Sequence, residues 1–247
     1  MMKNSILFVY AHPDDETFTA GITISKYAQE TDAAIHVVSA TRGQAGKPGN
    51  PPLCTVEELP QVRERELREA CAILGVTTVE LWDYEDKKLD QVPVSELAAH
   101  VHAAIARLRP QAVVTFAPHG ISGHPDHKAI SAAVTQAIQT LPEGSPVRKL
   151  YYATRASDRT FGAIQPVFGD PYDAITTIIQ APAYTRQVGM ALRAHRTQHL
   201  SVERVFPGVP AGDYSNVPDQ NHFILAWNNI PGYTISGKEH DVFAGIE

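Results

Sequence analysis

The sequence of 247 residues has only two cysteines, and no run of apolar residues approaches the ~20 needed to span a membrane. Cys54 and Cys71 cannot form a disulfide framework and fit no metal-binding spacing, so we expect free thiols in a reducing compartment. The beginning of the sequence resembles no signal peptide, because Asp14 follows only a short apolar run. These absences predict a cytoplasmic protein without a membrane span.

The sequence also has no excess of basic residues. The sequence has 27 acidic and 21 basic residues, which gives a formal net charge of −6. Nucleic acids and anionic membranes attract positively charged surfaces, so this balance argues against both as the main partner. We expect a small-molecule partner instead. The sequence does not define an oligomeric state, so a homo-oligomer remains open.

The glycine-rich fingerprints of nucleotide-binding proteins are missing as well. No G-x-G-x-x-G follows any predicted strand. The Gly46-Lys47 pair resembles part of a P-loop, but Thr41 stands where the first glycine would be and Pro48 replaces Ser or Thr. A nucleotide-dependent Rossmann enzyme is therefore disfavoured.

Apolar strands alternate with helical patterns along most of the chain, and 43% of the residues are hydrophobic. This alternation predicts a Rossmann-like, doubly wound α/β fold, in which helices cover both faces of a mostly parallel sheet. We expect one domain over residues 1–247, with loop or lid regions at about 156–172 and 206–220. The expected strands are 6–10, 33–39, 77–82, 112–116, 149–153, 173–180 and 223–227. The expected helices are 15–30, 59–74, 94–108, 125–140 and 185–199.

The first strand leads directly into an unusual polar turn. Ile6 to Tyr10 is continuously apolar or aromatic, and His12, Asp14 and Asp15 follow it. A strand that feeds a helix delivers its turn residues to the carboxyl edge of the sheet, where open α/β folds place their sites. Capping of the next helix explains one or two acidic residues but not the histidine beside them. The turn therefore indicates a functional site.

A second turn of the same kind follows the strand at 112–116. His124 and His127 are three residues apart, as are His12 and Asp15, and both turns belong to the same edge of a parallel sheet. Catalytic zinc takes three protein ligands from nitrogen and oxygen donors and keeps one position open. We therefore expect His12 and Asp15 to bind a metal with His124 or His127. Asp14 would remain beside it as a general base.

Three other histidines are weaker candidates. His195 and His199 have the i, i+4 spacing of zincins, but Arg196 stands where their catalytic glutamate would be. We expect His195 to line a pocket and His199 to be exposed. His36 lies within a predicted strand, where a histidine in the core or on the face of the sheet is commoner than a ligand.

The two turns resemble the PIG-L/LmbE-like family of zinc-dependent N-deacetylases. The resemblance rests on Ala11-His12-Pro13-Asp14-Asp15-Glu16 and Gly123-His124-Pro125-Asp126-His127. Further similarity lies at Thr41–Gly43, Arg63–Leu67, Leu74-Gly75, Asp86 and Ala191–Gln198. Members of the family remove acetyl from N-acetylglucosaminyl groups, including those of mycothiol and bacillithiol precursors and of glycosylphosphatidylinositol. The resemblance implies a metal-dependent amidohydrolase that acts on an N-acetylated amino sugar or glycoconjugate.

The same resemblance assigns roles within the site. The ligands of zinc, or of an exchangeable divalent ion such as Fe²⁺, would be His12, Asp15 and His127. Asp14 would take a proton from the attacking water. His124, held by Asp126, would as imidazolium stabilise the oxyanion and protonate the leaving amine. The residues expected to contact the substrate are Arg63 and, with weaker support, Arg42, Asp86 and Arg155.

Two residues depart from the family pattern. Gln44 follows Thr-Arg-Gly where the family usually carries glutamate, and Ser122 stands where mycothiol-pathway members carry tyrosine. Both bear on substrate specificity rather than on metal chemistry, and mycothiol-type specificity has the least support. A second hypothesis is a zinc-containing sugar-binding protein without turnover. Retention of Asp14 and His124, which binding alone does not require, argues against it.

Overall fold

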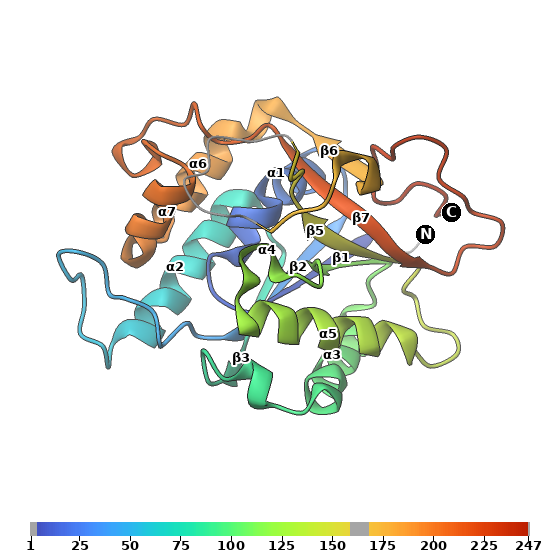
Figure 1. Ribbon diagram of the computed structural model, residues 1–247, viewed down its shortest axis with the longest axis horizontal. Coiled ribbons are helices and arrows are strands. Elements are labelled where there is room, and N and C mark those ends of the chain that lie inside the picture. The colour runs from blue at the N-terminus through green and yellow to red at the C-terminus, as the bar shows by residue number, and fades with distance from the viewer. Residues whose placement is uncertain (1–3, 159–167, 247) are drawn as a thin grey trace.

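The computed structural model describes residues 4–158 and 168–246, and its centre is a seven-stranded sheet (Figure 1). The strand order is β3-β2-β1-β4-β5-β7-β6. Strands β1 to β5 pair in parallel, whereas β7 runs antiparallel to both β5 and β6. The strands are β1 (Ser5–Tyr10), β2 (Ala34–Thr41), β3 (Thr78–Tyr84), β4 (Ala112–Phe116), β5 (Lys149–Thr154), β6 (Thr177–Gln180) and β7 (Gln220–Asn228).

Strand β1 is the centre of the core. All six of its residues are buried, as its unbroken apolar run predicts for a strand covered on both faces. It pairs with β2 on one side, with Phe8 opposite Val37, and with β4 on the other, with Phe8 opposite Val114. The chain order reverses between β1 and β4. Open α/β sheets bind ligands at the carboxyl ends of such strands.

Helices cover both faces of the sheet (Figure 1). On one face α1, α2 and α6 pack together, and on the other α3 packs against α5. The helices are α1 (Asp15–Glu30), α2 (Leu59–Leu74), α3 (Val94–Leu108), α4 (Gly120–Gly123), α5 (Pro125–Gln139), α6 (Thr185–Ala194) and α7 (His199–Val205). The predicted fold class is confirmed. Among the described residues, no helix combines the length and the apolar character needed to cross a bilayer.

The chain beyond β5 differs from the expected pattern. The helix expected over 185–199 is interrupted: α6 ends before His195, and a 3₁₀ turn over Arg196–Gln198 precedes α7. The interruption lets His195 turn inward, where its side chain is 1% exposed. The strand expected from 173 begins only at Thr177, because a 3₁₀ turn occupies Tyr172–Ala174.

The expected loop regions are covered only in part. Within 156–172, residues 159–167 lie outside the described residues. The region 206–220 has a short 3₁₀ turn over Val209–Ala211 and is otherwise irregular until β7 begins.

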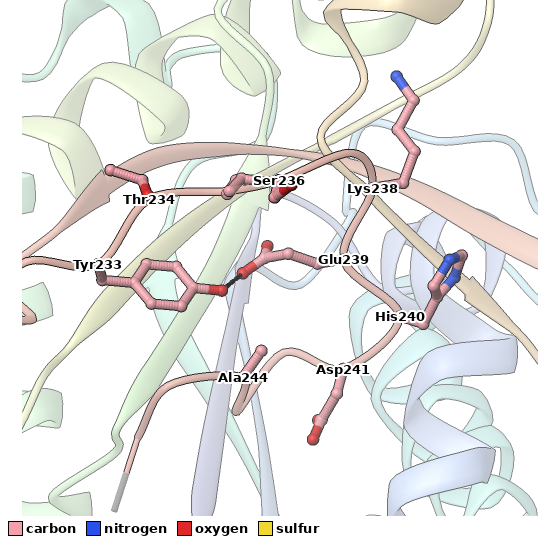
Figure 2. Close-up of a pocket in the computed structure, with 9 residues that line it drawn as sticks. Tyr233, Thr234, Ser236, Lys238, Glu239, His240, Asp241 and Ala244 are labelled. Carbon is pink, nitrogen blue, oxygen red and sulfur yellow. Dashed lines mark hydrogen bonds between the residues drawn. The ribbon is translucent and has the colours of Figure 1, made fainter.

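The segment after β7 folds back against the start of β5. Lys149, the first residue of β5, is fully buried and lies 2.5 Å from the Glu239 carboxylate. Tyr151, Tyr233 and Thr177 also donate to Glu239. Figure 2 shows Tyr233 and Glu239 meeting at a cavity of about 360 Å³. This buried cluster fixes the segment to the sheet.

Candidate metal centre

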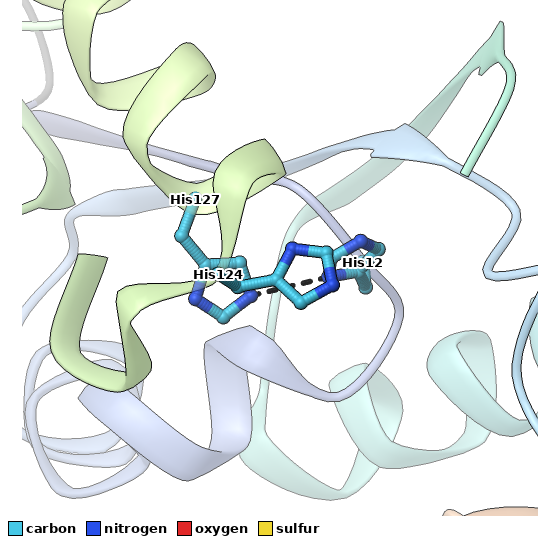
Figure 3. Close-up of side chains that lie close together, drawn as sticks. All are labelled: His12, His124 and His127. Atoms are coloured by element: carbon cyan, nitrogen blue, oxygen red, sulfur yellow. Dashed lines mark hydrogen bonds between the residues drawn. The ribbon is translucent and has the colours of Figure 1, made fainter. Parts of the chain in front are cut away.

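The turns after β1 and β4 bring three potential ligands together. Nδ1 of His12 lies 3.2 Å from Nε2 of His127. The two carboxylate oxygens of Asp15 lie 3.3 Å from Nε2 of His127 and 3.5 Å from Nδ1 of His12. Asp15 is held in this direction because it accepts a hydrogen bond from the backbone N–H of His12, at 2.8 Å. Figure 3 shows the rings of His12 and His127 converging from these two turns, with His124 beside them.

These separations suit a tetrahedral ion. Zinc binds nitrogen and oxygen at about 2.0–2.2 Å, which places neighbouring tetrahedral ligands about 3.4 Å apart. The donor atoms of His12, Asp15 and His127 are separated by 3.2–3.5 Å. His124 also has a ring nitrogen within 4.8 Å of those of His12 and His127. The residues present therefore fit a divalent metal.

The outward nitrogens of both histidines have partners that fix their tautomers. Nε2 of His12 lies 3.0 Å from Asp86 and 3.1 Å from Asp126. Nδ1 of His127 lies 2.9 Å from the carbonyl oxygen of Gly120. Each ring can thus donate outward and keep a lone pair directed at the centre, as metal-binding histidines do.

Asp86 was expected to contact substrate, but the structure places it against His12, where it also accepts from the backbone N–H of Ala45. The position of Asp86 at the carboxyl end of β3 predicted that it would lie near the site, but it did not predict the contact with His12.

The charges of the cluster depend on one another. Burial alone would raise the pKa of Asp15, but His127 and His12 hold it well below its usual range. Burial lowers the pKa of His127, which favours the neutral ring that a metal requires. Burial would also lower the pKa of His12, but Asp126, Asp15 and Asp86 raise it. The cluster thus gathers carboxylates around the imidazole of His12.

The side chain of Asp14, next to Asp15 in the sequence, is the more accessible of the two. Its side chain is 16% exposed, compared with 9% for Asp15. Burial raises the pKa of Asp14 to about 6, although the nearby Arg63 guanidinium opposes the shift. Nη2 of Arg63 donates to the Asp14 carboxylate at 3.1 Å. A carboxylate with this pKa beside a metal site suits a general base.

Arg63 was expected to reach the sugar, but its described hydrogen bonds are all internal. It donates to the carbonyl oxygens of Gly43 and Pro13 as well as to Asp14. The side chain is 5% exposed. Arg63 therefore ties the turns after β1 and β2 together and orients Asp14.

The expected pairing of His124 with Asp126 takes a different form. Nδ1 of His124 accepts from the backbone N–H of Asp126 at 3.2 Å. The carboxylate of Asp126 instead accepts from the backbone N–H groups of Lys87 and Leu89 and lies against His12. Burial and the neighbouring His12 lower the pKa of His124. The structure thus favours a neutral His124 that carries its proton on Nε2, rather than the expected imidazolium.

The two other arginines occupy different places. Arg42 is held on the surface by Asp83 and Glu64, so its described ion pairs lie outside the metal centre. Arg155 lies at the end of β5 against the start of α1, where Nη2 is 3.5 Å from the carbonyl oxygen of Phe18. Burial lowers the pKa of Arg155.

The remaining histidines do not join the metal centre. Nδ1 of His36 lies 2.7 Å from Thr78 on the neighbouring strand. His199 is half-buried and lies 3.1 Å from the carbonyl oxygen of Asn50. His195 lies 3.1 Å from the Glu16 carboxylate, beneath the turn that carries Asp14. Glu16 was not predicted to have a role in the site, since an acidic residue in a first helical turn is common.

Comparisons with known proteins agree with this geometry. Residues 7–138 match the family described as PIG-L, GlcNAc-PI de-N-acetylase. The chain is 32% identical to the 1D-myo-inositol 2-acetamido-2-deoxy-alpha-D-glucopyranoside deacetylase of Thermobifida fusca, over 99% of this chain and 100% of that protein. It is 36% identical to the probable N-acetyl-alpha-D-glucosaminyl L-malate deacetylase 2 of Bacillus anthracis, over 67% of this chain and 73% of the relative.

A solved structure shares the fold. The N,N'-diacetylchitobiose deacetylase of Pyrococcus horikoshii superposes with a TM-score of 0.68 at 20% identity, over 90% of this chain and 83% of that one.

Proposed function

Because this chain belongs to the PIG-L family of de-N-acetylases, we propose that it uses zinc to hydrolyse the acetamide of an N-acetylglucosamine derivative. The predictions of the family and of hydrolytic N-deacetylation are confirmed by the relatives, which are named as deacetylases. The alternative of a binding protein without turnover gains no support from them.

The observation that carries the proposal is the convergence of His12, Asp15 and His127, with the carboxylate of Asp14 beside them. These three residues would hold the zinc, with His12 oriented by Asp86 and Asp126. Zinc bound there would polarise the amide oxygen and lower the pKa of the attacking water, which reaches about 7 in the strongest cases.

The other residues move protons and stabilise charge. Asp14 accepts a proton from water while the water oxygen bonds to the amide carbon. His124 donates from Nε2 to the amide oxygen as negative charge develops there. The C–N bond then breaks, the amine nitrogen takes up the proton that Asp14 accepted, and acetate and the free amino sugar leave. Arg63 keeps the Asp14 carboxylate in place throughout.

The relatives support a substrate class. The relatives are named as deacetylases of N-acetylglucosaminides of L-malate and of inositol, so an N-acetylglucosaminyl group with a small polar aglycone is the proposed substrate. Gln44 and Ser122 are candidates for selecting the aglycone. Nε2 of Gln44 donates to the carbonyl oxygen of Tyr84, and the Ser122 hydroxyl lies 3.3 Å from His127.

The test measures acetate release from N-acetylglucosaminyl malate, N-acetylglucosaminyl inositol and N,N'-diacetylchitobiose, with metal content determined on the same protein. We expect about one divalent ion per chain and release from at least one substrate. Asp14→Asn should keep the metal and lose about 10²–10⁴ in kcat, because asparagine has the same shape but cannot accept the proton. Near-normal turnover by Asp14→Asn with metal present would contradict the mechanism.

A further inference from the structure

Asp14 occupies the N-cap position of α1, yet it does not cap the helix. An N-cap aspartate normally accepts a hydrogen bond from the backbone N–H two or three residues later. The Asp14 side chain makes no such bond and is directed at Arg63 instead. The backbone of Asp14 is also strained, with φ at 119°, a conformation that non-glycine residues rarely adopt. Something other than the Asp14 side chain must hold this turn.

Glu16 holds it. The backbone N–H of Asp14 donates to Oε2 of Glu16 at 3.1 Å. This contact gives the backbone N–H of the strained residue an acceptor, while the carboxylate of Asp14 takes no part in capping the helix. Glu16 is 1% exposed, and a buried carboxylate is stable only when it has partners.

Those partners come from two elements. Thr17 donates to Oε1 of Glu16 at 2.5 Å, and Nε2 of His195 lies 3.1 Å from the same oxygen. His195 reaches this position because α6 ends just before it. Ordinary helix capping uses residues of the same turn, whereas His195 is 179 residues away from Glu16 in the sequence. The arrangement is therefore more than ordinary capping by an acidic residue.

We propose that Glu16, held by His195, is a positioning residue that fixes the backbone of Asp14 so that its carboxylate faces the reacting water. The inference rests on the proposed function, since it requires Asp14 to be the base. It adds two residues that neither bind the metal nor touch substrate. Their effect is on turnover, because a misplaced base reduces the rate without changing how the substrate binds.

Glu16→Ala should lower kcat about 10–100-fold and change KM less than about threefold, with the metal retained. Glu16→Gln keeps an oxygen that can accept from the Asp14 N–H, so it should recover most of the rate. Because Glu16 acts through Asp14, adding Glu16→Ala to Asp14→Asn should lower the residual rate less than about twofold. A purely structural role would predict losses that multiply.

Glu66→Ala is the matched control. Glu66 is equally buried and holds Thr197, two residues from His195, through that residue's N–H and hydroxyl. It makes no described contact with Asp14. We expect a comparable loss of thermal stability but a kcat within about twofold of wild type.

Equal losses of kcat in Glu16→Ala and Glu66→Ala, multiplying losses in the double variant, or loss of metal in Glu16→Ala would overturn the proposal. Normal turnover by Asp14→Asn alone would instead overturn the proposed function, and this inference with it.

Discussion

At the residue scale, backbone strain is concentrated around the metal centre. Four described residues other than glycine have positive φ, and three of them lie in the turns after β1, β3 and β4: Asp14, Lys87 and Ile121. The backbone N–H of each of these three residues donates to a side chain. The acceptors are Glu16 for Asp14, Asp126 for Lys87 and His119 for Ile121. Strain of this kind persists only where surrounding contacts impose it. The site is therefore held in place before substrate arrives.

His124 provides a residue-scale prediction. Its Nδ1 accepts from the backbone, so Nε2 is the donor left for the amide oxygen. His124→Ala should keep the metal and lose about 10²–10³ in kcat, the usual cost of one such donor. Metal analysis and acetate release on the same sample check both parts. Loss of metal in this variant would instead show that His124 is a ligand.

At the element scale, the turn after β2 is packed against α2 through Gly43 and Arg63. Gly43 has φ of +65°, and a Cβ there would lie 2.1 Å from the Arg63 guanidinium. Gly43→Ala should therefore displace Arg63 from Asp14 and lower kcat at least about tenfold.

Gly144→Ala is its control, since Gly144 has φ of +78° but nothing within 4 Å of a Cβ. Both variants should lose about 1–2 kcal/mol from backbone strain, measured by denaturant unfolding, but only Gly43→Ala should lose activity. Equal activity in the two would mean that Arg63 does not orient the base.

The elements also show what could be read from the sequence. The convergence of His12 and Asp15 with the turn of His124 and His127 was predictable, because both turns lie at one edge of a parallel sheet. The choice between the two histidines came from the family resemblance. The direction in which each side chain points was not predictable. Asp86, in the turn after β3, and Asp126 both lie against His12, and Lys87 of the same turn donates to Asp126. A sequence does not reveal these contacts. His195 could not be assigned to Glu16, since its helix was expected to continue past it.

At the scale of the whole molecule, the buried cluster around Glu239 fixes the last segment to the sheet. Burial and the Glu239 carboxylate raise the pKa values of Tyr151 and Tyr233, so both remain hydroxyl donors. Glu239→Gln leaves Lys149 buried without its counter-ion and should lower the free energy of unfolding by about 3–5 kcal/mol. The activity of the folded protein should not change, because Lys149 starts β5 and the metal centre lies at the opposite ends of the strands.

Denaturant unfolding and acetate release measured on the same preparations test this separation. Adding Lys149→Met to Glu239→Gln should restore part of the lost stability, since it removes the unpaired charge. A large fall in kcat for the folded single variant would show that the cluster communicates with the site.

The order of the site residues along the chain has a consequence for biosynthesis. His12, Asp15, Asp86, Asp126 and His127 all leave the ribosome before residue 128, and the strands that carry them form the first half of the sheet. His195 is translated much later. The ribosome thus delivers all five of these residues before it delivers the histidine that holds Glu16. A chain truncated between residues 128 and 194 would carry the proposed ligands without that histidine.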